Sequence, residues 1–559
     1  MKKVVGLLLC GVLAVSAAAC SPKKEVKTLT GTGKGFGGEI TVTVTTEDGK
    51  ITKVEAVGEK ETQGIGSNAI EQLPAKIVEA GNTDVDTIAG ATVSSKGILY
   101  AVNNALDPEA YPWPIEESKK DVNEVVASDA DMGFGVASSG RVGPGKDDQE
   151  VQVYSFNQVY ASAIFDKEGK ILELHIDQLE VATPNYDGET MPHFSGYPGQ
   201  TGYNIDENHD GKVDGVTENT EDLFMSEIDG WKTKRERGDG YVMGTGYWYQ
   251  QMDKYESIFV GMSVDEVEEW FAKYCSDLNG RPLQANASKD EDVKKYEALS
   301  QEEKDMLADV TSSATMSLQD GHGDILKAIK KAYENRRPLT IEGAKGLGFG
   351  VANSGRVGPG KDDQEVQVYS FNDVFVTTLF DENDKIAAMM IDQLEVATPN
   401  YDGETMPHFS GYPGQSYNID ENHDGKVDGV TENTEDLFMS EIDGWKTKRE
   451  RGDGYVMGTG YWYQQMDKYE SIFVGMSVDE VEEWFAKYCS DLNGRPLQAN
   501  ASKDEDVKKY EALSQEEKDM LADVTSSATM SLQDGHGDIL KAIRKSLENK
   551  HAIDLKIGQ

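Results

Sequence analysis

Three copies of one short threonine motif are the strongest chemical signal in the sequence. In each copy an aspartate precedes a threonine by six positions, and small residues stand just before the threonine. A bulky group can therefore approach the hydroxyl, and a helix that starts close behind offers N–H groups and a positive dipole end to a phosphate. The alternative interpretation is that these Ser/Thr-rich segments only cap helices. The motif residues are Asp86, Gly90, Ala91 and Thr92; Asp309, Ser313, Ala314 and Thr315; and Asp523, Ser527, Ala528 and Thr529.

An acidic loop that occurs twice is the second signal. Carboxylate and amide side chains occupy its positions 1, 3, 5 and 9, with glycine at position 6, which resembles the calcium loops of dockerins and EF-hands. Position 12 is threonine instead of a bidentate acid, so we expect weak binding, with a Kd of about 10⁻⁴–10⁻³ M. The alternative is a solvated acidic turn. The candidate ligands are Asp206, Asn208, Asp210 and Asp214 in the first loop and Asp420, Asn422, Asp424 and Asp428 in the second.

Two glycine-rich segments do not predict nucleotide binding. Residues 33–38 fit G-x-G-x-x-G but precede a strand, whereas a dinucleotide fingerprint follows one. Residues 140–146 fit G-x-x-x-x-G-K, but Asp147 stands where Ser or Thr must hold Mg²⁺. Both segments are interpreted as glycine turns.

Isolated cysteines and histidines favour structural roles. Cys275 and Cys489 are equivalent positions in two repeats and are expected to be buried small hydrophobes. His193 and His408 lie in loops where a structural role is the first expectation and a cofactor or substrate contact the second.

The elements that must position these motifs come from a duplicated chain. The stretch that begins at Gly133 recurs almost unchanged from Gly348, with an offset of 215 that falls to 214 beyond Ser416. Units of this length predict tandem globular domains rather than a solenoid. We expect a signal peptide at 1–20, a smaller unit at 28–106, a linker at 107–131, a first repeat at 132–335, a second linker at 336–345 and a second repeat at 346–550.

Periodicity predicts an α+β fold of three tandem domains with antiparallel β-meanders and terminal amphipathic helices. Residues 39–45 alternate with β-branched side chains, residues 48–50 form a turn and residues 51–57 return as a strand. Residues 151–156, 159–165 and 171–176 predict the same meander in the first repeat. The units end in helices expected at 97–106, 323–333 and 537–547.

Composition excludes several functional classes. The 559 residues carry a formal net charge of −45, which leaves little to neutralise the phosphates of a nucleic acid. Only four cysteines occur, which excludes a disulfide scaffold, an iron–sulfur protein or a zinc-cluster protein. Hydrophobic residues reach 38%, enough to form globular cores.

The N-terminus predicts export and lipid anchoring. Two lysines precede a short apolar stretch, which ends in small residues and Cys20. This pattern resembles a bacterial lipobox, in which Cys20 would be lipidated, although Ala17 stands where leucine is usual. The alternative is ordinary cleavage and a free secreted protein.

The threonine motif resembles the flavinylation motif of FMN-binding domains, the family found in the C and G subunits of Na⁺-pumping quinone reductase and Rnf complexes. The resemblance is best in residues 28–106 and covers the glycine-rich start, the hairpin, Glu61–Gly66 and Asp86–Leu106. It implies FMN held as a phosphoester on Thr92, Thr315 and Thr529, with the aspartate needed by a flavin transferase. In the repeats, Ser313 and Ser527 replace Gly90 and the helix lies farther from the threonine.

The sequence thus predicts an extracytoplasmic, lipid-anchored electron carrier with up to three covalent FMN groups and calcium as a further candidate ligand. The expected donor is a membrane quinone or NADH dehydrogenase system, and the expected acceptor is an extracellular reductase, a metal ion or a soluble mediator. Two alternatives stay open. One is a flavin-dependent extracellular reductase with a pocket in the large repeats, and the other is a calcium-binding surface lipoprotein without a redox role.

Overall fold

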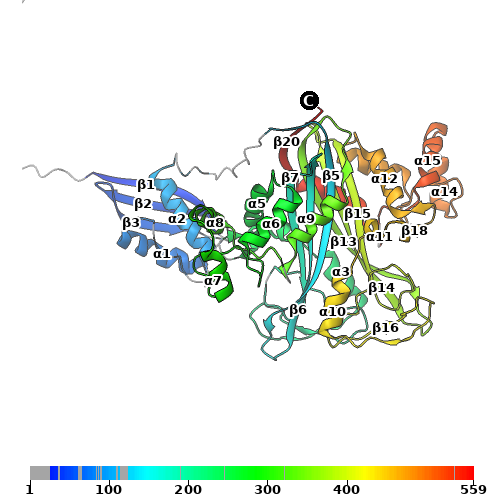
Figure 1. Cartoon of the computed structure of the whole chain (residues 1–559), viewed down its shortest axis with the longest axis horizontal. Coiled ribbons are helices and arrows are strands. Elements are labelled where there is room, and N and C mark those ends of the chain that lie inside the picture. The colour runs from blue at the N-terminus through cyan, green and yellow to red at the C-terminus, as the bar shows by residue number, and fades with distance from the viewer. Residues whose placement is uncertain are drawn as a thin grey trace, which may run out of the picture. The chain divides into compact units, whose positions relative to one another are not determined.

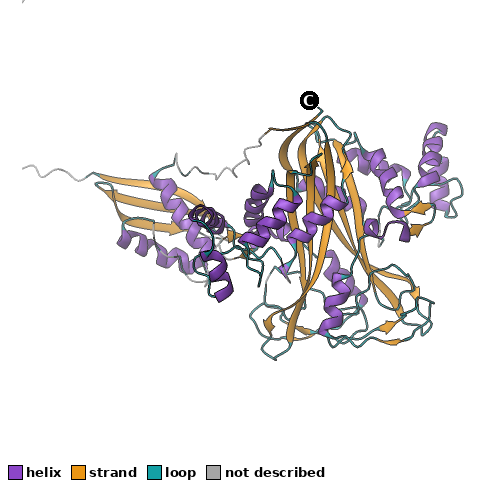
Figure 2. Cartoon of the chain, viewed as in Figure 1, coloured by secondary structure: helices purple, strands orange, loops and turns teal. Residues whose placement is uncertain are grey.

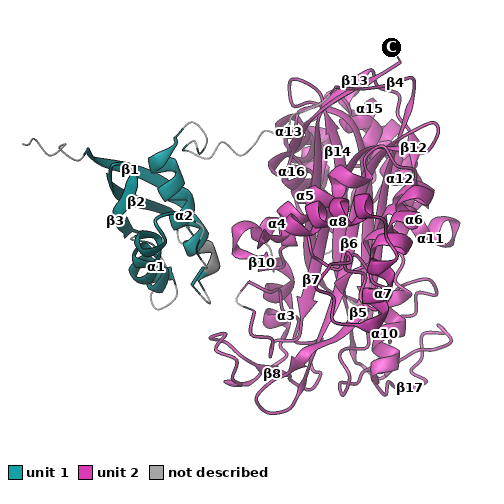
Figure 3. Cartoon of the chain, turned by 60° about the vertical axis from the view of Figure 1, so that its left-hand side comes forward, with its two compact units in different colours: residues 1–121 teal, residues 122–559 magenta. Residues whose placement is uncertain are grey.

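The computed structural model describes residues 25–35, 38–58, 60, 66–83, 85, 87–88, 91–108, 111, 113, 124–188, 190–243, 246–319, 322–533 and 536–558. The predicted lipidation site Cys20, together with Asp86 and Gly90 of the first threonine motif, lies outside these residues. The chain divides into two compact units, residues 1–121 and 122–559 (Figure 3).

The N-terminal unit is a small antiparallel sheet with two helices. Strands β1 (Val26–Lys34), β2 (Glu39–Glu47) and β3 (Lys50–Val57) pair in the order β1-β2-β3. The predicted hairpin is confirmed: Glu47 pairs with Lys50 across a two-residue turn in which Asp48 and Gly49 have φ of 49° and 79°. Helices α1 (Gly66–Ala80) and α2 (Thr92–Leu106) cover the face that buries Ile40, Val42 and Val44.

Each large repeat builds a sheet of long antiparallel strands, so the α+β prediction is confirmed. In the first repeat, β5 (Ala130–Lys146), β6 (Gln152–Asp166) and β7 (Ile171–Ala182) join β12 (Arg337–Pro338) in the order β12-β5-β6-β7. In the second, the order is β15-β14-β13-β20-β4. Its strands are β13 (Gly343–Lys361), β14 (Gln367–Phe380), β15 (Ile386–Ala397), β20 (His551–Ile557) and β4 (Glu124–Ala127).

Most helices of each repeat cover the outer face of its sheet, and one short helix per repeat packs in a separate small cluster (Figures 1 and 2). The first repeat contributes α5 (Trp248–Phe259), α6 (Val264–Tyr274), α7 (Asp290–Glu297), α8 (Gln301–Ser313) and α9 (Ile325–Glu334). The second contributes α12 (Trp462–Phe473), α13 (Val478–Tyr488), α14 (Asp504–Glu511), α15 (Gln515–Ser527) and α16 (Ile539–Glu548). The S-x-x-E patterns at residues 263–266 and 300–303 form capping boxes, with Ser263 and Ser300 as the N-caps of α6 and α8. Among the described residues, no helix is long and apolar enough to cross a membrane.

The two sheets share one core. Strand β6 alternates: Phe156 and Tyr160 belong to a cluster shared with the second repeat, whereas Val159 and Phe165 pack under the helices of their own repeat. Phe156 stacks on its equivalent, Phe371, with ring centroids 6.0 Å apart. Unit 2 is therefore layered helix–sheet–sheet–helix.

Short helices interlock the repeats further. Helix α3 (Glu221–Asp229) of the first repeat packs on β13, and α10 (Glu435–Asp443) of the second packs on β5. The hydroxyl of Tyr154 donates to Glu435 (2.9 Å), and that of Tyr369 donates to Glu221 (2.8 Å). The structure differs here from the expectation of tandem repeats joined by a linker at residues 336–345, because this segment supplies β12 and the start of β13. The long central strands are apolar on both faces, so each sheet is covered by helices on one face and by the other repeat on the other.

A pair of glycines in the first strand brings the terminal helix close in all three sequence units. A Cβ at Gly33 would lie 2.2 Å from the Gly97 carbonyl oxygen of α2. The same contact holds for Gly135, 2.3 Å from Ala328 of α9, and for Gly350, 2.1 Å from Ala542 of α16. These glycines therefore serve close helix–strand packing, which the sequence analysis interpreted only as turns at residues 33–38.

Candidate functional site

Thr92 is the first residue of helix α2. The helix is fixed against β1 by the glycine contacts, and Ile98, Ala101 and Val102 on its inner side are fully buried. Just before it, the N–H of Ile88 donates to Ser95 Oγ (3.0 Å), and the N–H of Ala91 donates to the Ile88 carbonyl (3.0 Å). Ile88 and Ala91, which precede Thr92, are thus held by hydrogen bonds to each other and to the helix.

The start of α2 suits a phosphate. Its N-cap residue, Ala91, is buried and has no side chain that can cap the first N–H groups. No acidic residue lies in the first turn of α2. The positive end of the helix dipole is therefore not neutralised by a carboxylate of that turn, and an FMN phosphate on Thr92 fits this position.

The equivalent threonines in the repeats follow the C-terminal end of a helix instead of opening one. Asp309 lies within α8, Ser313 is the last residue of that helix, and buried Ala314 is its C-cap. Thr315 follows, and α9 begins at Ile325, ten positions later. The N–H of Thr315 donates to Gln251 Oε1 (2.9 Å). Thr315 therefore follows the negative end of α8 and does not open the terminal helix.

The second repeat has the same arrangement. Asp523 lies within α15, Ser527 ends it, Ala528 caps it, and Thr529 precedes α16 by ten positions. The N–H of Thr529 donates to Gln465 Oε1 (2.9 Å). Asp309 and Asp523 are exposed and form ion pairs of 2.7 Å with Lys254 and Lys468. These two sites do not present the helix start that fits a phosphate at Thr92.

The carboxylates of each acidic loop accept hydrogen bonds from N–H groups of the same loop. Buried Asp206 accepts from the N–H groups of Asp210 (3.1 Å) and Gly211 (2.8 Å). Asp214 accepts from the Glu207 N–H (3.0 Å) and from Asn208 Nδ2 (3.1 Å). Asp420, Asn422, Asp424 and Asp428 repeat this pattern. In the part of the chain that the structure describes, no three His, Cys, Asp or Glu side chains are grouped to hold a metal ion, so calcium stays a prediction.

His193 and His408 each lie beside a histidine of the acidic loop. The ring of His193 is 5.8 Å from that of His209, and the ring of His408 is 5.6 Å from that of His423. Burial and, to a smaller extent, the neighbouring histidine lower the pKa of His193 and of His408 to about 4, against an opposing effect of Asp206 and Asp420. The sequence analysis weighed each histidine alone and did not predict these pairs.

The two cysteines are inert, as expected of buried small hydrophobes. Cys275 and Cys489 are free thiols with about 1% exposure. Burial raises the pKa of each thiol to about 12, which leaves almost no thiolate at neutral pH.

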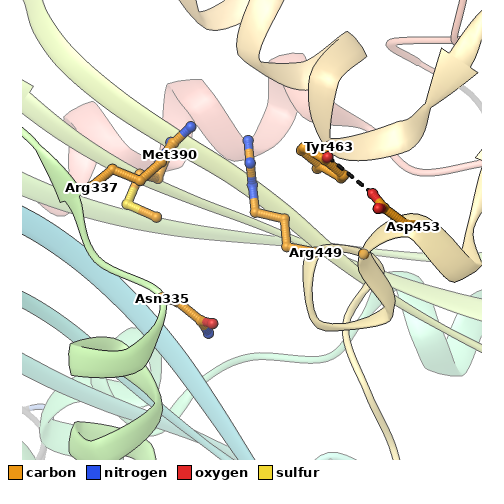
Figure 4. A pocket seen from close by; sticks show the side chains of 7 residues that line it. Asn335, Arg337, Met390, Arg449, Asp453 and Tyr463 are labelled. Atoms are coloured by element: carbon orange, nitrogen blue, oxygen red, sulfur yellow. Dashed lines mark hydrogen bonds between the residues drawn. The ribbon is translucent and has the colours of Figure 1, made fainter.

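A pocket of about 420 Å³ lies where the end of the first repeat meets the second (Figure 4). Its charged groups are largely paired: Arg337 donates to Asp467 (2.6 Å) and Glu470 (2.9 Å), and Arg449 donates to the same two carboxylates. Tyr463 donates to Asp453 (3.1 Å). The remaining lining residues are Asn335, Met390 and Gly452.

The two repeats differ at this pocket. With the repeat offsets, Met390 corresponds to His175 and Arg337 to His551. His175 of the first repeat stacks on His551 of β20, which follows the second repeat, with ring centroids 5.2 Å apart. The pocket was not predicted because Arg337 was placed in a linker. The signal in the sequence was that His175 and Met390, and likewise Arg337 and His551, differ although the repeats are otherwise nearly identical.

Comparison with known proteins identifies one domain. The model of the FMN-binding domain family matches residues 35–107. Chlorophenol reductase of Desulfitobacterium hafniense is 36% identical over 193 residues, covering 33% of this chain and 52% of the reductase. Urocanate reductase of Eggerthella lenta is 33% identical over 151 residues, 23% of this chain and 25% of that protein. NADH:acrylate oxidoreductase of Vibrio harveyi is 32% identical over 115 residues, 18% of this chain and 12% of that protein.

These matches support a flavoprotein with a redox role. The predicted resemblance to FMN-binding domains is confirmed for the N-terminal unit. The chain spans about half the length of the first of these relatives and a quarter or less of the other two.

Proposed function

We propose that this protein is an extracytoplasmic electron-transfer flavoprotein that carries FMN covalently on Thr92. One observation carries the proposal: the FMN-binding domain match ends in a helix, α2, whose first residue is Thr92. When bound, FMN supplies a group that accepts electrons from one partner and passes the same electrons to another. The residues of the chain hold and orient it.

The attachment requires a flavin transferase and an activated flavin nucleotide. The Thr92 oxygen forms a bond to the FMN phosphorus, the bond from phosphorus to the leaving group of the donor breaks, and the hydroxyl proton is lost to a base. The N–H groups at the start of α2 stabilise the phosphate charge. A covalent bond also retains the cofactor outside the cell, where a dissociated flavin is lost by dilution.

The carrier is proposed to be lipid-anchored at Cys20 and to receive electrons from a membrane quinone or NADH dehydrogenase. Its acceptor is proposed to be an extracellular reductase, a metal ion or a soluble mediator. The acidic surface, at a net charge of −45, favours cationic partners at low ionic strength.

The decisive experiment is the intact mass of protein produced with its flavin transferase. We expect a mass increase for covalent FMN, loss of that increase in Thr92→Ala and retention in Thr92→Ser, which keeps a hydroxyl. In-gel flavin fluorescence provides a second measurement. Unchanged fluorescence at the N-terminal unit in Thr92→Ala would overturn the assignment.

A second function, a flavin-dependent reductase, is favoured by the pocket lined by Arg337, Arg449 and Tyr463 and by the reductase names of the relatives. It requires steady-state turnover of an organic acceptor by purified flavinylated protein. Loss of that turnover in Tyr463→Phe, with flavin content unchanged, would assign the reaction to this pocket.

A further inference from the structure

Four buried imidazole nitrogens form two equivalent pairs. Nε2 of His193 and Nδ1 of His209 are buried and have no hydrogen-bond partner among the described residues, and the same is true of Nε2 of His408 and Nδ1 of His423. Buried polar atoms normally have a partner, so an unsatisfied pair on neighbouring rings requires an explanation such as a bound ion or water.

The backbones that carry the two rings are well fixed. His193 pairs with Ala182 at the end of β7, and its carbonyl accepts from Trp231 Nε1 (2.8 Å). His209 lies directly before the two N–H groups that buried Asp206 binds, and it has a φ of 55°, in the left-handed region where asparagine, aspartate and histidine are enriched among residues other than glycine. The hydrogen bonds of the acidic loop thus fix the backbone of His209 beside His193.

The ring separations are compatible with a metal ion held between the two rings. An ion about 2.1 Å from each nitrogen lies about 3.2 Å from each ring centre, so two rings around it are about 5.2 Å apart at a tetrahedral angle and at most about 6.4 Å apart. The observed 5.8 and 5.6 Å fall within the range for the ion.

We propose that each large repeat binds one late first-row transition-metal ion, of the Zn²⁺ or Cu²⁺ class, through the side chains of His193 and His209 or of His408 and His423. Imidazole nitrogen is a preferred ligand of these ions, whereas calcium takes oxygen ligands. The described residues supply two histidine ligands per ion. The histidine ligands differ from the predicted calcium ligands, although His209 and those ligands lie in one loop that the hydrogen bonds of Asp206 stabilise.

The test is titration of chelator-treated full-length protein with Zn²⁺ by calorimetry. About 1 mM Ca²⁺ and moderate salt are present so that the acidic surface and the loop carboxylates are not available to zinc. We expect one zinc per repeat, that is, two per chain. His209→Asn should leave one, and the double variant with His423→Asn should leave none. Asparagine is chosen because it tolerates the positive φ at these positions.

A matched control changes the neighbouring loop residues Asp210→Asn and Asp424→Asn and should still bind two zinc ions. Circular dichroism checks the fold, and His193→Gln with His408→Gln provides a second pair of variants if the loop variants misfold. X-ray absorption at the zinc edge should show nitrogen ligands. The proposal is overturned if the wild type binds no zinc, if the histidine variants still bind two ions, or if the aspartate control loses them.

Discussion

The N-terminal unit and the large repeats share a packing device but differ at the threonine. In each, a glycine pair on the first strand lets the terminal helix approach closely, as at Gly33, Gly135 and Gly350. In the N-terminal unit Thr92 opens that helix, whereas Thr315 and Thr529 follow the end of another helix and precede the terminal one by ten positions. The same residue spacing thus places the threonine at helix ends of opposite polarity.

The largest expected effect tests that difference directly. Thr92→Ala should remove most of the covalent flavin, whereas Thr315→Ala and Thr529→Ala should change it little, because only Thr92 has a helix start to stabilise the phosphate. Intact mass of each single variant counts the flavins. Equal losses from all three variants would show that helix polarity does not decide attachment and that the sequence motif alone does.

This case shows what the sequence predicts and what it does not. The hairpin at 39–57 and the capping boxes at Ser263 and Ser300 follow from local residue patterns and are present. The extension of α8 through Asp309 to Ser313 is not local: aspartate, valine, threonine and serine have low helix propensity, and this helix packs against α5. Spacing along the chain therefore predicted the motif but not the direction of the dipole beside it.

The shared core of the repeats likewise could not be predicted from the sequence. Strand β6 is apolar on both faces, which predicts burial on both, but a sequence repeat does not state that the second covering layer is its own copy. The pocket at Arg337 follows from the same fact, since it exists only where the two copies meet.

The next prediction tests whether the two repeats of unit 2 unfold together. Phe156→Ala removes a ring from the core shared by both repeats and should destabilise unit 2 by about 3–5 kcal/mol. Six of the seven tryptophans lie beyond residue 122, so urea unfolding followed by tryptophan fluorescence reports this unit. Both repeats should unfold in one transition at lower urea. A variant in which only half of the signal shifts would show that the repeats unfold independently.

Ile40→Ala is the matched change in the N-terminal unit. It removes a fully buried side chain from a separate core and should leave the main tryptophan transition in place. A shift of that transition in Ile40→Ala would contradict the independence of the two units.

A smaller effect comes from a place where the shared core is polar and differs between the repeats. Asp373 stands where the first repeat has Gln158, and the two side chains meet: Gln158 Nε2 donates to Asp373 (2.8 Å), as does Asn353 Nδ2 (2.6 Å). Burial raises the pKa of Asp373 to about 6, and these hydrogen bonds offset only part of that rise. The contact explains how two nearly identical repeats can complement each other.

The pH dependence follows from the direction of this change. In the unfolded chain Asp373 loses its proton near pH 3.8, and in the folded protein near pH 6, so its contribution to stability falls as pH rises between these values. Above pH 6 the loss is up to about 3 kcal/mol. Asp373→Asn should therefore be more stable than wild type at pH 7.5, with an advantage that disappears near pH 4. Urea titrations at the two pH values measure it, and a pH-independent difference would exclude ionisation as the cause.

The smallest effect concerns the acidic loops, which the N-terminal unit lacks. Calcium must displace the N–H groups that Asp206 and Asp420 already bind, which fits affinity at the weak extracellular end. At ten times its Kd, calcium adds about 1.4 kcal/mol per loop to the folded state, or about 3 °C in the melting temperature of unit 2 for both loops. Calorimetry with and without calcium should show this rise in the wild type. Asp206→Asn with Asp420→Asn should abolish the rise, because the amide keeps the size of the side chain but not its charge. The transition of the N-terminal unit should not move with calcium in either protein. An equal shift of both transitions would mean that calcium screens the net charge of the whole chain and does not bind these loops.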